Sequence, residues 1–264
     1  AMTEFDNGIG VLLDELEKLG IDENTIVIIS SDNGAMQFAW PDGGTSPFRN
    51  EKATTWEGGF RVPAVVRWPG VVEPGTVIND IFHHMDWMPT FMAALGEPDI
   101  AGKLKEGYEA DGRTFKVHLD GYNQLDLLKG DGPGNRTEIH YISDDGDYSA
   151  FRYNRWKIYF LTQSAVGIDV WDAPYVAHRF PPIVDLRADP FERALGRADR
   201  AGAETASFNY DNWHFRRSYL LVPAQVFVGQ FLASFEEFPP RSAPASFAVG
   251  DALKSLETAG SGAH

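Results

Sequence analysis

The stretch TIVIISSDNGAMQFAWPDGGTSPFRNEKATTWEGGFRVPAVVR, residues 25–67, decides the fold. It opens with a mostly β-branched apolar run at residues 25–29, and a second strand-like run covers residues 60–68 before Pro69 and Gly70. A short apolar run between polar and turn residues is typical of a fully buried strand in a parallel sheet. We therefore expect an α/β sheet around these two runs.

Asp32 and Asn33 come directly after the first of these strands. In open α/β sheets, ligands bind beyond the carboxyl ends of the strands. A carboxylate and an amide oxygen are hard donors, which suit Ca²⁺ or Mg²⁺ better than a soft metal. The position of the two residues therefore indicates a divalent cation site, although an Asp-Asn-Gly sequence can also simply cap a turn.

The composition narrows the classes of partner. The 264 residues carry a net charge of -15, which argues against nucleic acid and anionic membranes as partners. The chain has no cysteine, which excludes disulfides and thiolate metal sites and leaves the cellular compartment open. No apolar run approaches the roughly 18 residues of a membrane span, so we expect none.

Two helices are predicted on either side of the central stretch. Residues 6–19 place apolar side chains on one helical face, and Gly20 can end that helix. The face consists of Ile9, Leu12, Leu13, Leu16 and Leu19. A second helix should begin at Asp86 as its N-cap and end near residue 95. His83 and His84 precede it, and we interpret them as packing residues rather than as a metal ligand or an acid.

The second half of the chain changes character. Short aromatic and β-branched runs at residues 139–142, 148–153 and 156–161 are separated by turns such as the one at 144–146. This pattern predicts an antiparallel meander, and the 144–147 turn is interpreted as a tight hairpin rather than a calcium loop. An apolar stripe should place a helix against the meander; it consists of Val222, Val226, Phe227, Phe231 and Phe235.

Several ordered motifs resemble those of the type I sulfatases, or arylsulfatases, of the alkaline phosphatase superfamily. They are the sequence SDNG at 31–34, NEKATTWEGGFRVP at 50–63, WPG at 68–70, the D-x-x-P-T pattern at 86–90 and the D-L-x-x-D-P-x-E pattern at 185–192. The resemblance implies the C-terminal portion of an alkaline-phosphatase-like α/β sheet domain at residues 1–100. A connecting segment at 101–137 and a small antiparallel-sheet and helix domain at 138–264 would follow.

The same resemblance implies the chemistry of the site. Asp32 and Asn33 would be calcium ligands, and Lys52 would contact the sulfate of a sulfate ester substrate. Family members use a formylglycine nucleophile made from a C/S-x-P-x-R motif. That motif has no match here, because the nearest sequence, at residues 242–246, has Ser246 where arginine is required.

The missing motif leads to three expectations. The chain should be the C-terminal part of a sulfatase, inactive without an N-terminal segment that carries the nucleophile. Calcium takes roughly six to eight oxygen ligands, so two ligands predict weak or absent calcium in the isolated chain. The exposed edge of an incomplete sheet should also favour homo-oligomers.

Two other functions compete with this interpretation. Phosphodiesterases and phosphonate hydrolases of the same superfamily tend to carry Asp-His after this strand for a transition metal, so Asn33 favours a calcium sulfatase. A non-catalytic binding or assembly module would explain the missing nucleophile, but it has no need of Asp32, Asn33 and Lys52 together. On its own, Lys52 would be an ordinary surface lysine, and we expect Arg61 to pair with Glu57. Aryl, sugar and steroid sulfates all remain open as substrates.

Overall fold

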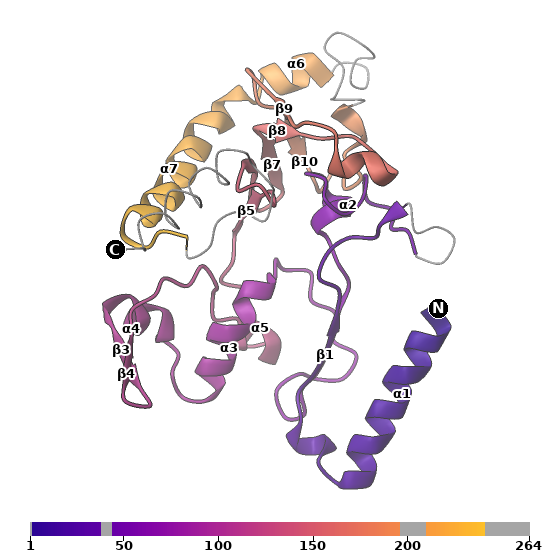
Figure 1. Cartoon of the computed structure of the whole chain (residues 1–264), viewed down its shortest axis with the longest axis vertical. Coiled ribbons are helices and arrows are strands. Elements are labelled where there is room, and N and C mark those ends of the chain that lie inside the picture. The colour runs from indigo at the N-terminus through magenta and orange to yellow at the C-terminus, as the bar shows by residue number, and fades with distance from the viewer. Residues whose placement is uncertain (1, 38–43, 196–209, 241–264) are drawn as a thin grey trace, which may run out of the picture.

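Figure 1 shows the computed structural model of the chain, which describes residues 2–37, 44–195 and 210–240. Its α-helices are α1 (Met2–Leu19), α2 (Glu57–Phe60), α3 (Trp87–Ala94), α4 (Ile100–Glu106), α5 (Leu125–Lys129), α6 (Tyr210–Phe215) and α7 (Leu221–Glu237). Its strands are β1 (Val27–Ser30), β2 (Ala64–Arg67), β3 (Tyr108–Ala110), β4 (Arg113–Phe115), β5 (Glu138–Ile142), β6 (Tyr148–Tyr153), β7 (Trp156–Tyr159), β8 (Leu161–Thr162), β9 (Val176–Ala177) and β10 (Ile183–Asp185).

The two strands of the central stretch form, but they do not form a parallel sheet. β1 pairs with β2 in antiparallel register, with Val27 opposite Arg67 and Ser30 opposite Ala64. Every residue of β1 is half-buried rather than fully buried. The prediction of a fully buried parallel strand was therefore wrong for this pair. A β-branched run specifies a strand but not its neighbour, and here the 31–63 loop returns the second run alongside the first.

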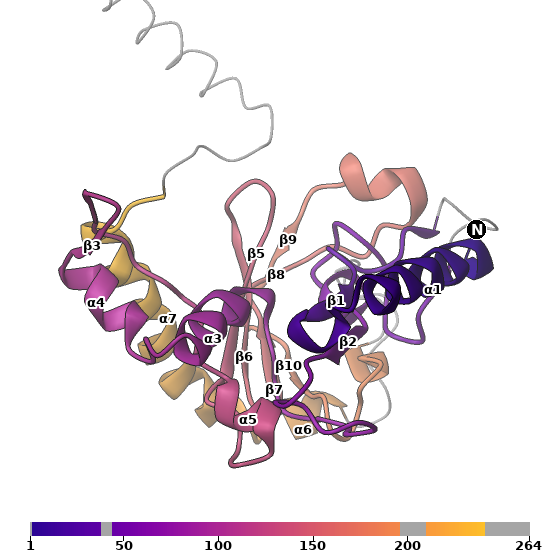
Figure 2. The same ribbon diagram turned by 90° about the horizontal axis from the view of Figure 1, so that it is seen from below.

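Helix α1 is confirmed, but no residue on it is buried. Gly20 ends the helix with φ +66°, as predicted, and Ile21 N donates to Leu16 O at 3.1 Å. Two residues of the predicted apolar face, Leu12 and Leu19, are 67% and 62% exposed. Figures 1 and 2 show α1 and α7 on opposite sides of the molecule. Ile9, Leu13 and Leu16 on the same face are half-buried, so the described residues cover the apolar side of α1 only in part.

Asp86 is the N-cap residue of helix α3, as predicted, but its side chain makes no capping hydrogen bond to that helix. Its carboxylate is fully buried and accepts hydrogen bonds from Arg136 Nη2 at 2.6 Å, His83 N at 2.9 Å and Tyr122 N at 2.8 Å. The residue therefore joins three separate segments of the chain. A sequence pattern cannot distinguish this role from a cap, because the partners lie up to 50 positions away.

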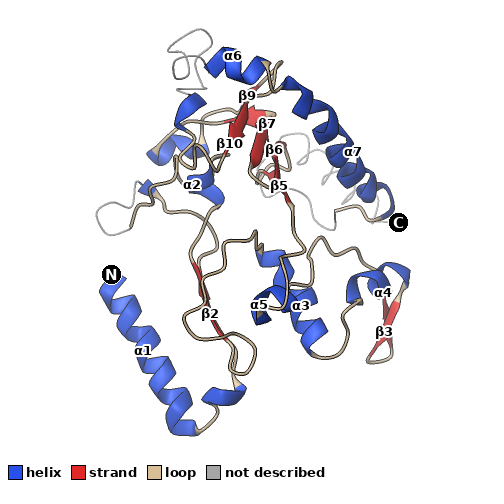
Figure 3. Cartoon of the chain, turned by 180° about the vertical axis from the view of Figure 1, so that it is seen from behind, coloured by secondary structure: helices blue, strands red, loops and turns tan. Residues whose placement is uncertain are grey.

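The predicted antiparallel meander is confirmed as a four-stranded sheet with the order β10-β7-β6-β5 (Figure 3). Helix α7 packs on it through part of the predicted stripe. Phe227 stacks on Phe151 at 5.6 Å between ring centroids, and Phe231 stacks on His140 at 3.9 Å. Val222 and Val226 instead point outward, 65% and 57% exposed. The stripe of aromatic residues thus faces the sheet, and the valines do not.

By length and composition alone, one helical segment of the described chain could cross a membrane. It is Ser218–Glu237, with a mean hydropathy of 1.3. We expected no such segment from the lengths of the apolar runs, and polar residues such as Gln225 and Gln230 do interrupt this one. The packing of α7 on the sheet accounts for its apolar aromatic side.

One hydrophobic core joins the central stretch to the C-terminal sheet. Trp56, from the loop between β1 and β2, is fully buried against Tyr141, Tyr159 and Val184. Its indole Nε1 donates to Gln163 O. The loop between the first two strands is therefore held by residues more than 80 positions further along the chain, and the division at residues 100 and 137 stays a prediction.

Candidate active site

The three residues singled out by the sequence line one pocket. Asp32, Asn33 and Lys52 border a cavity of about 370 Å³ at the end of β1. The other residues in its wall come from the same loop, from the segment just before α3, and from the C-terminal sheet and its connections. They include Phe60, His83, His84, Ile142, Asp144 and Tyr175. The cavity is therefore built from segments spread over some 140 positions of the chain.

Glycines bring the end of β1 to the Lys52 loop. Gly34 N donates to Gly59 O at 2.9 Å, and a Cβ placed on Gly34 would lie 1.7 Å from Gly58 O. Gly58 is equally tight, because its own Cβ would lie 2.1 Å from Arg49 O. Only residues without a side chain permit this approach of two backbones. The backbones of the SDNG and EGG motifs are therefore in direct contact, and this contact places Asp32 and Asn33 beside the loop that carries Lys52.

The backbone around Lys52 is held in an uncommon conformation. Asn50 and Ala53 have φ values of +62° and +65°, and the left-handed region costs a non-glycine residue about 1 kcal/mol or more. Two anchors offset this strain. Lys52 N donates to Ala35 O at 3.0 Å, and the fully buried Glu51 carboxylate accepts from the backbone N of Gln37 and Gly167. The Lys52 ammonium lies 5.8 Å from the ring centre of Trp171.

His83 and His84 line the pocket as well, which corrects their interpretation as core-packing residues. His84 Nε2 lies 3.0 Å from Ser31 O, and His83 Nδ1 accepts from Met85 N at 3.1 Å. Burial, with the charge of Arg136, lowers the pKa of His83 to about 4, so this imidazole is neutral at pH 7. No local motif signals their position, because the contact with Ser31 joins residues 53 positions apart.

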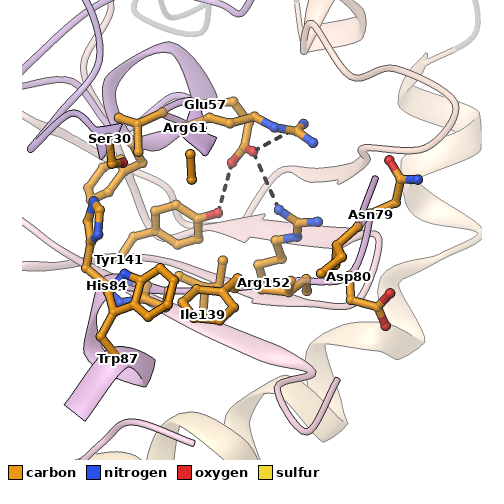
Figure 4. Close-up of a pocket in the computed structure, with 17 residues that line it drawn as sticks. Ser30, Glu57, Arg61, Asn79, Asp80, His84, Trp87, Ile139, Tyr141 and Arg152 are labelled. Atoms are coloured by element: carbon orange, nitrogen blue, oxygen red, sulfur yellow. Dashed lines mark hydrogen bonds and ion pairs between the residues drawn. The ribbon is translucent and has the colours of Figure 1, made fainter. Parts of the chain in front are cut away.

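A second cavity, of about 310 Å³, adjoins the first and shares Phe60, His83 and His84 with it. Figure 4 shows Glu57 reaching from its wall to the Tyr141 hydroxyl and to Arg152. The predicted pair of Arg61 with Glu57 forms at 4.0 Å. Glu57 thus fixes the end of the Lys52 loop against the C-terminal sheet.

A buried lysine completes this attachment. Lys157, on β7, is fully buried, and its Nζ lies 2.9 Å from Glu57 Oε1 and 3.4 Å from Glu192 Oε1. Burial alone would raise the pKa of Glu57, but Lys157 and Arg152 outweigh it and lower that pKa to about 2. Burial, together with the charge of Glu57, raises the pKa of Glu192, and the Lys157 cation 3.4 Å away offsets this only in part. Lys157 therefore stabilises the charged form of Glu57 more than that of Glu192. As the pH falls, Glu192 takes up a proton before Glu57 does.

The donor atoms at the end of β1 fit calcium in kind but not in number. Asp32 and Asn33 offer hard oxygens. Within residues 2–37, 44–195 and 210–240, no group of three or more His, Cys, Asp or Glu side chains could hold a metal ion. Two such oxygens are fewer than the roughly six to eight that calcium takes. The serine sequence at 242–246 lies outside the described residues.

Comparisons with known proteins agree with these features. Residues 1–97 match the family model described as Sulfatase. Over 204 residues the chain is 31% identical to arylsulfatase A of Homo sapiens, covering 73% of this chain and 37% of that protein. Over 211 residues it is 38% identical to N-acetylgalactosamine-6-sulfatase of Canis lupus familiaris, with the same two shares.

A solved structure shows the same likeness in three dimensions. A sulfatase from Pseudoalteromonas sp. superposes with a TM-score of 0.65 at 28% identity, over 92% of this chain and 44% of that one. The likeness confirms the predicted fold, part of an alkaline-phosphatase-like α/β domain followed by an antiparallel sheet with a helix. The chain spans less than half the length of each of these relatives.

Proposed function

The chain belongs to the sulfatase family, and on that premise we propose that it forms the C-terminal part of a sulfuric ester hydrolase that acts on sulfate esters. In this proposal Asp32 and Asn33 contribute oxygen ligands to a calcium ion, and Lys52 binds the sulfuryl oxygens. The observation that carries the proposal is the shared cavity that the three residues line. A non-catalytic module would have no need to gather these groups at one strand end.

Each group has a distinct chemical task. Hydrolysis of a sulfate ester builds negative charge on the sulfuryl oxygens and on the leaving oxygen, and cations aimed at those atoms stabilise the transition state. Lys52 supplies one such charge from a backbone that the buried Glu51 and Glu57 hold in place. When bound, calcium would supply further positive charge to the same oxygens. A neutral His83 can accept or donate one hydrogen bond in the same cavity without adding charge.

The proposal assigns the nucleophile to another part of the enzyme. In this family it is a formylglycine, and the relatives extend well beyond the length that this chain spans. The apolar side of α1, with Leu12 and Leu19 exposed, supports a further segment that packs there. Association of copies of this chain through that surface is the second way of covering it. The isolated chain would then be inactive and would bind calcium weakly.

The test uses the complete enzyme that contains this chain, assayed with 4-nitrophenyl sulfate. Lys52→Met should lower kcat/KM by about 100-fold or more, because it removes a charge that acts on the transition state. Lys129→Met is the matched control, since Lys129 is exposed on α5 and outside the pocket wall. A Lys52→Met enzyme as active as the control would refute the role of Lys52. Faster turnover of a phosphonate or phosphodiester would favour the other hydrolases of the superfamily.

Calcium binding offers a separate check. Calorimetric titration of the isolated chain should show weak binding or none, and the complete enzyme should bind one ion tightly. Asp32→Asn should weaken that binding in the complete enzyme, because it removes a charged ligand. One tight calcium site in the isolated chain would contradict the proposal that the coordination shell is divided.

A further inference from the structure

The wall of the Lys52 pocket also contains an acidic hairpin. Residues 143–147 connect β5 to β6, and the turn closes with Ser143 N donating to Asp147 O at 2.9 Å and Gly146 N donating to Ser143 O at 3.0 Å. Gly146 supplies the left-handed turn conformation at φ +82°. The flanking strands pair in the four-stranded sheet, so the hairpin is held on a rigid support. Asp144 itself lines the pocket.

The hairpin carboxylates are not neutralised by their surroundings. Asp144, Asp145 and Asp147 are exposed, and none of them has an ion-pair partner in the part of the chain that the structure describes. Their charge reaches the pocket wall. Burial raises the pKa of Tyr175, and the charges of these three aspartates raise it further. Tyr175 lines the same pocket, and its hydroxyl lies 3.5 Å from Ala53 O, next to Lys52.

The remaining wall offers apolar surface. Phe60 and Ile142 line the pocket and are 40% and 38% exposed, so their side chains are available to a bound molecule. Tyr175 adds an aromatic ring. The pocket wall therefore combines the Lys52 ammonium, the carboxylates of Asp32 and Asp144, and apolar side chains, with the other hairpin aspartates next to it. A molecule that fits this combination has one anionic group for Lys52 and an uncharged, partly apolar remainder.

From this combination, and resting on the proposed sulfatase function, we propose that the enzyme selects sulfate monoesters whose alcohol portion carries no further negative charge. Asp144, in the pocket wall, and Asp145, next to it on the same hairpin, are the specificity-determining residues. They repel a second sulfate or carboxylate on the substrate, while Phe60, Ile142 and Tyr175 contact the neutral alcohol. Polyanionic substrates are therefore disfavoured, and neutral aryl or cyclic alcohol sulfates are favoured. Like charges placed against each other at a binding surface act chiefly through such exclusion of wrong partners.

The experiment compares two substrates on the complete enzyme, 4-nitrophenyl sulfate and the same ester with a carboxylate added to the ring. The readout is the ratio of their kcat/KM values. The Asp144→Asn, Asp145→Asn double variant should shift this ratio toward the carboxylated substrate by about fivefold or more at low salt, and by less at high salt. Comparing enzymes on the same pair of substrates cancels the difference in their intrinsic reactivity.

Asp126→Asn is the matched control, because Asp126 is exposed on α5 and outside the pocket wall. Its ratio should equal that of the unmodified enzyme. A double variant with an unchanged ratio would overturn the proposal, and so would an equal loss of turnover on both substrates. If the unmodified enzyme hydrolyses neither ester, the proposed sulfatase function itself fails, and the inference fails with it. Turnover of both without a shift removes only the inference.

Discussion

Lys157 holds two buried carboxylates together, and its replacement by methionine should destabilise the protein strongly. The Lys157→Met side chain keeps a similar length and fills the same space without the charge. Glu57 and Glu192, both almost fully buried, would then face each other without the cation that lies 2.9 and 3.4 Å from them. Arg152, 3.6 Å from Glu57, would remain as partial compensation.

Two estimates give the size of the effect. Removing one partner of a buried ion pair costs about 3 to 5 kcal/mol. Independently, the pKa of Glu57 falls from 4.5 to about 2 in the folded protein. At about 1.36 kcal/mol per pKa unit, that shift corresponds to about 3 kcal/mol of stability. We therefore expect Lys157→Met to lower the free energy of unfolding by about 3 kcal/mol at pH 7.

The effect should depend on pH with a definite sign. In the unmodified protein the folded pKa of Glu57 lies below its unfolded value, so its stabilisation is present above pH 4.5 and is lost as pH falls toward 2. In the variant, burial without the cation raises the folded pKa of both carboxylates, so protonation relieves the penalty. The difference between the two proteins should therefore shrink as pH falls from 7 to 5.

The assay is urea unfolding followed by tryptophan fluorescence, which reports on this region because Trp56 is buried beside the cluster. Lys129→Met is the control for loss of an exposed lysine and should stay within about 0.5 kcal/mol of the unmodified protein. Adding Glu192→Gln to Lys157→Met should recover part of the loss. A Lys157→Met loss below about 1 kcal/mol, unchanged between pH 7 and 5, would refute the argument that this cation holds the cluster together.

Two further predictions concern other parts of the protein. Gly34→Ala should lower the free energy of unfolding by more than about 3 kcal/mol, because its Cβ would meet Gly58 O at 1.7 Å. Gly8→Ala on α1 is the control, and because there is open space around Gly8 it should be neutral or stabilising in thermal melts. Equal melting temperatures for the two variants would contradict the close contact between the two glycine backbones. Burial lowers the pKa of His140 from 6.5 to about 4, so neutral His140 contributes stability above pH 6.5 that is lost as pH falls toward 4. His140→Phe keeps a ring against Phe231 but cannot take up a proton. Between pH 7.5 and 5 its free energy of unfolding should therefore fall by about 1 kcal/mol less than that of the unmodified protein, after allowance for partial exposure. Urea unfolding at both pH values measures this, and equal losses in the two proteins would count against the prediction.

Sequence patterns predicted the elements of this protein well where the signal is local. The helix before Gly20, the β1 and β2 runs and the antiparallel meander all form. Each depends on spacing within one segment, which the chain carries regardless of its surroundings. The ordered SDNG and EKATTWEGG motifs also predicted Asp32, Asn33 and Lys52 as candidate site residues, and the structure brings them to one cavity.

Long-range contacts could not be predicted in the same way. The antiparallel pairing of β1 with β2, the burial of Asp86 against Arg136 and the approach of His84 to Ser31 all join distant segments. Side chains such as Asp86 and His83 look the same in sequence whether they cap a helix, pack in a core or face a cavity. Their neighbours decide between these roles, and those neighbours are known only after the chain has folded.

By itself, the sequence determined which residue types stand at a strand end and along a loop, because strand formation, glycine placement and hard oxygen donors are local properties. Only the tertiary structure decided that Lys157 and Glu192 hold the Lys52 loop against the C-terminal sheet, and that Asp144 enters the wall of the same pocket. The physical reason is that ion pairing and electrostatic repulsion depend on distance in space, whereas position along the chain leaves that distance open.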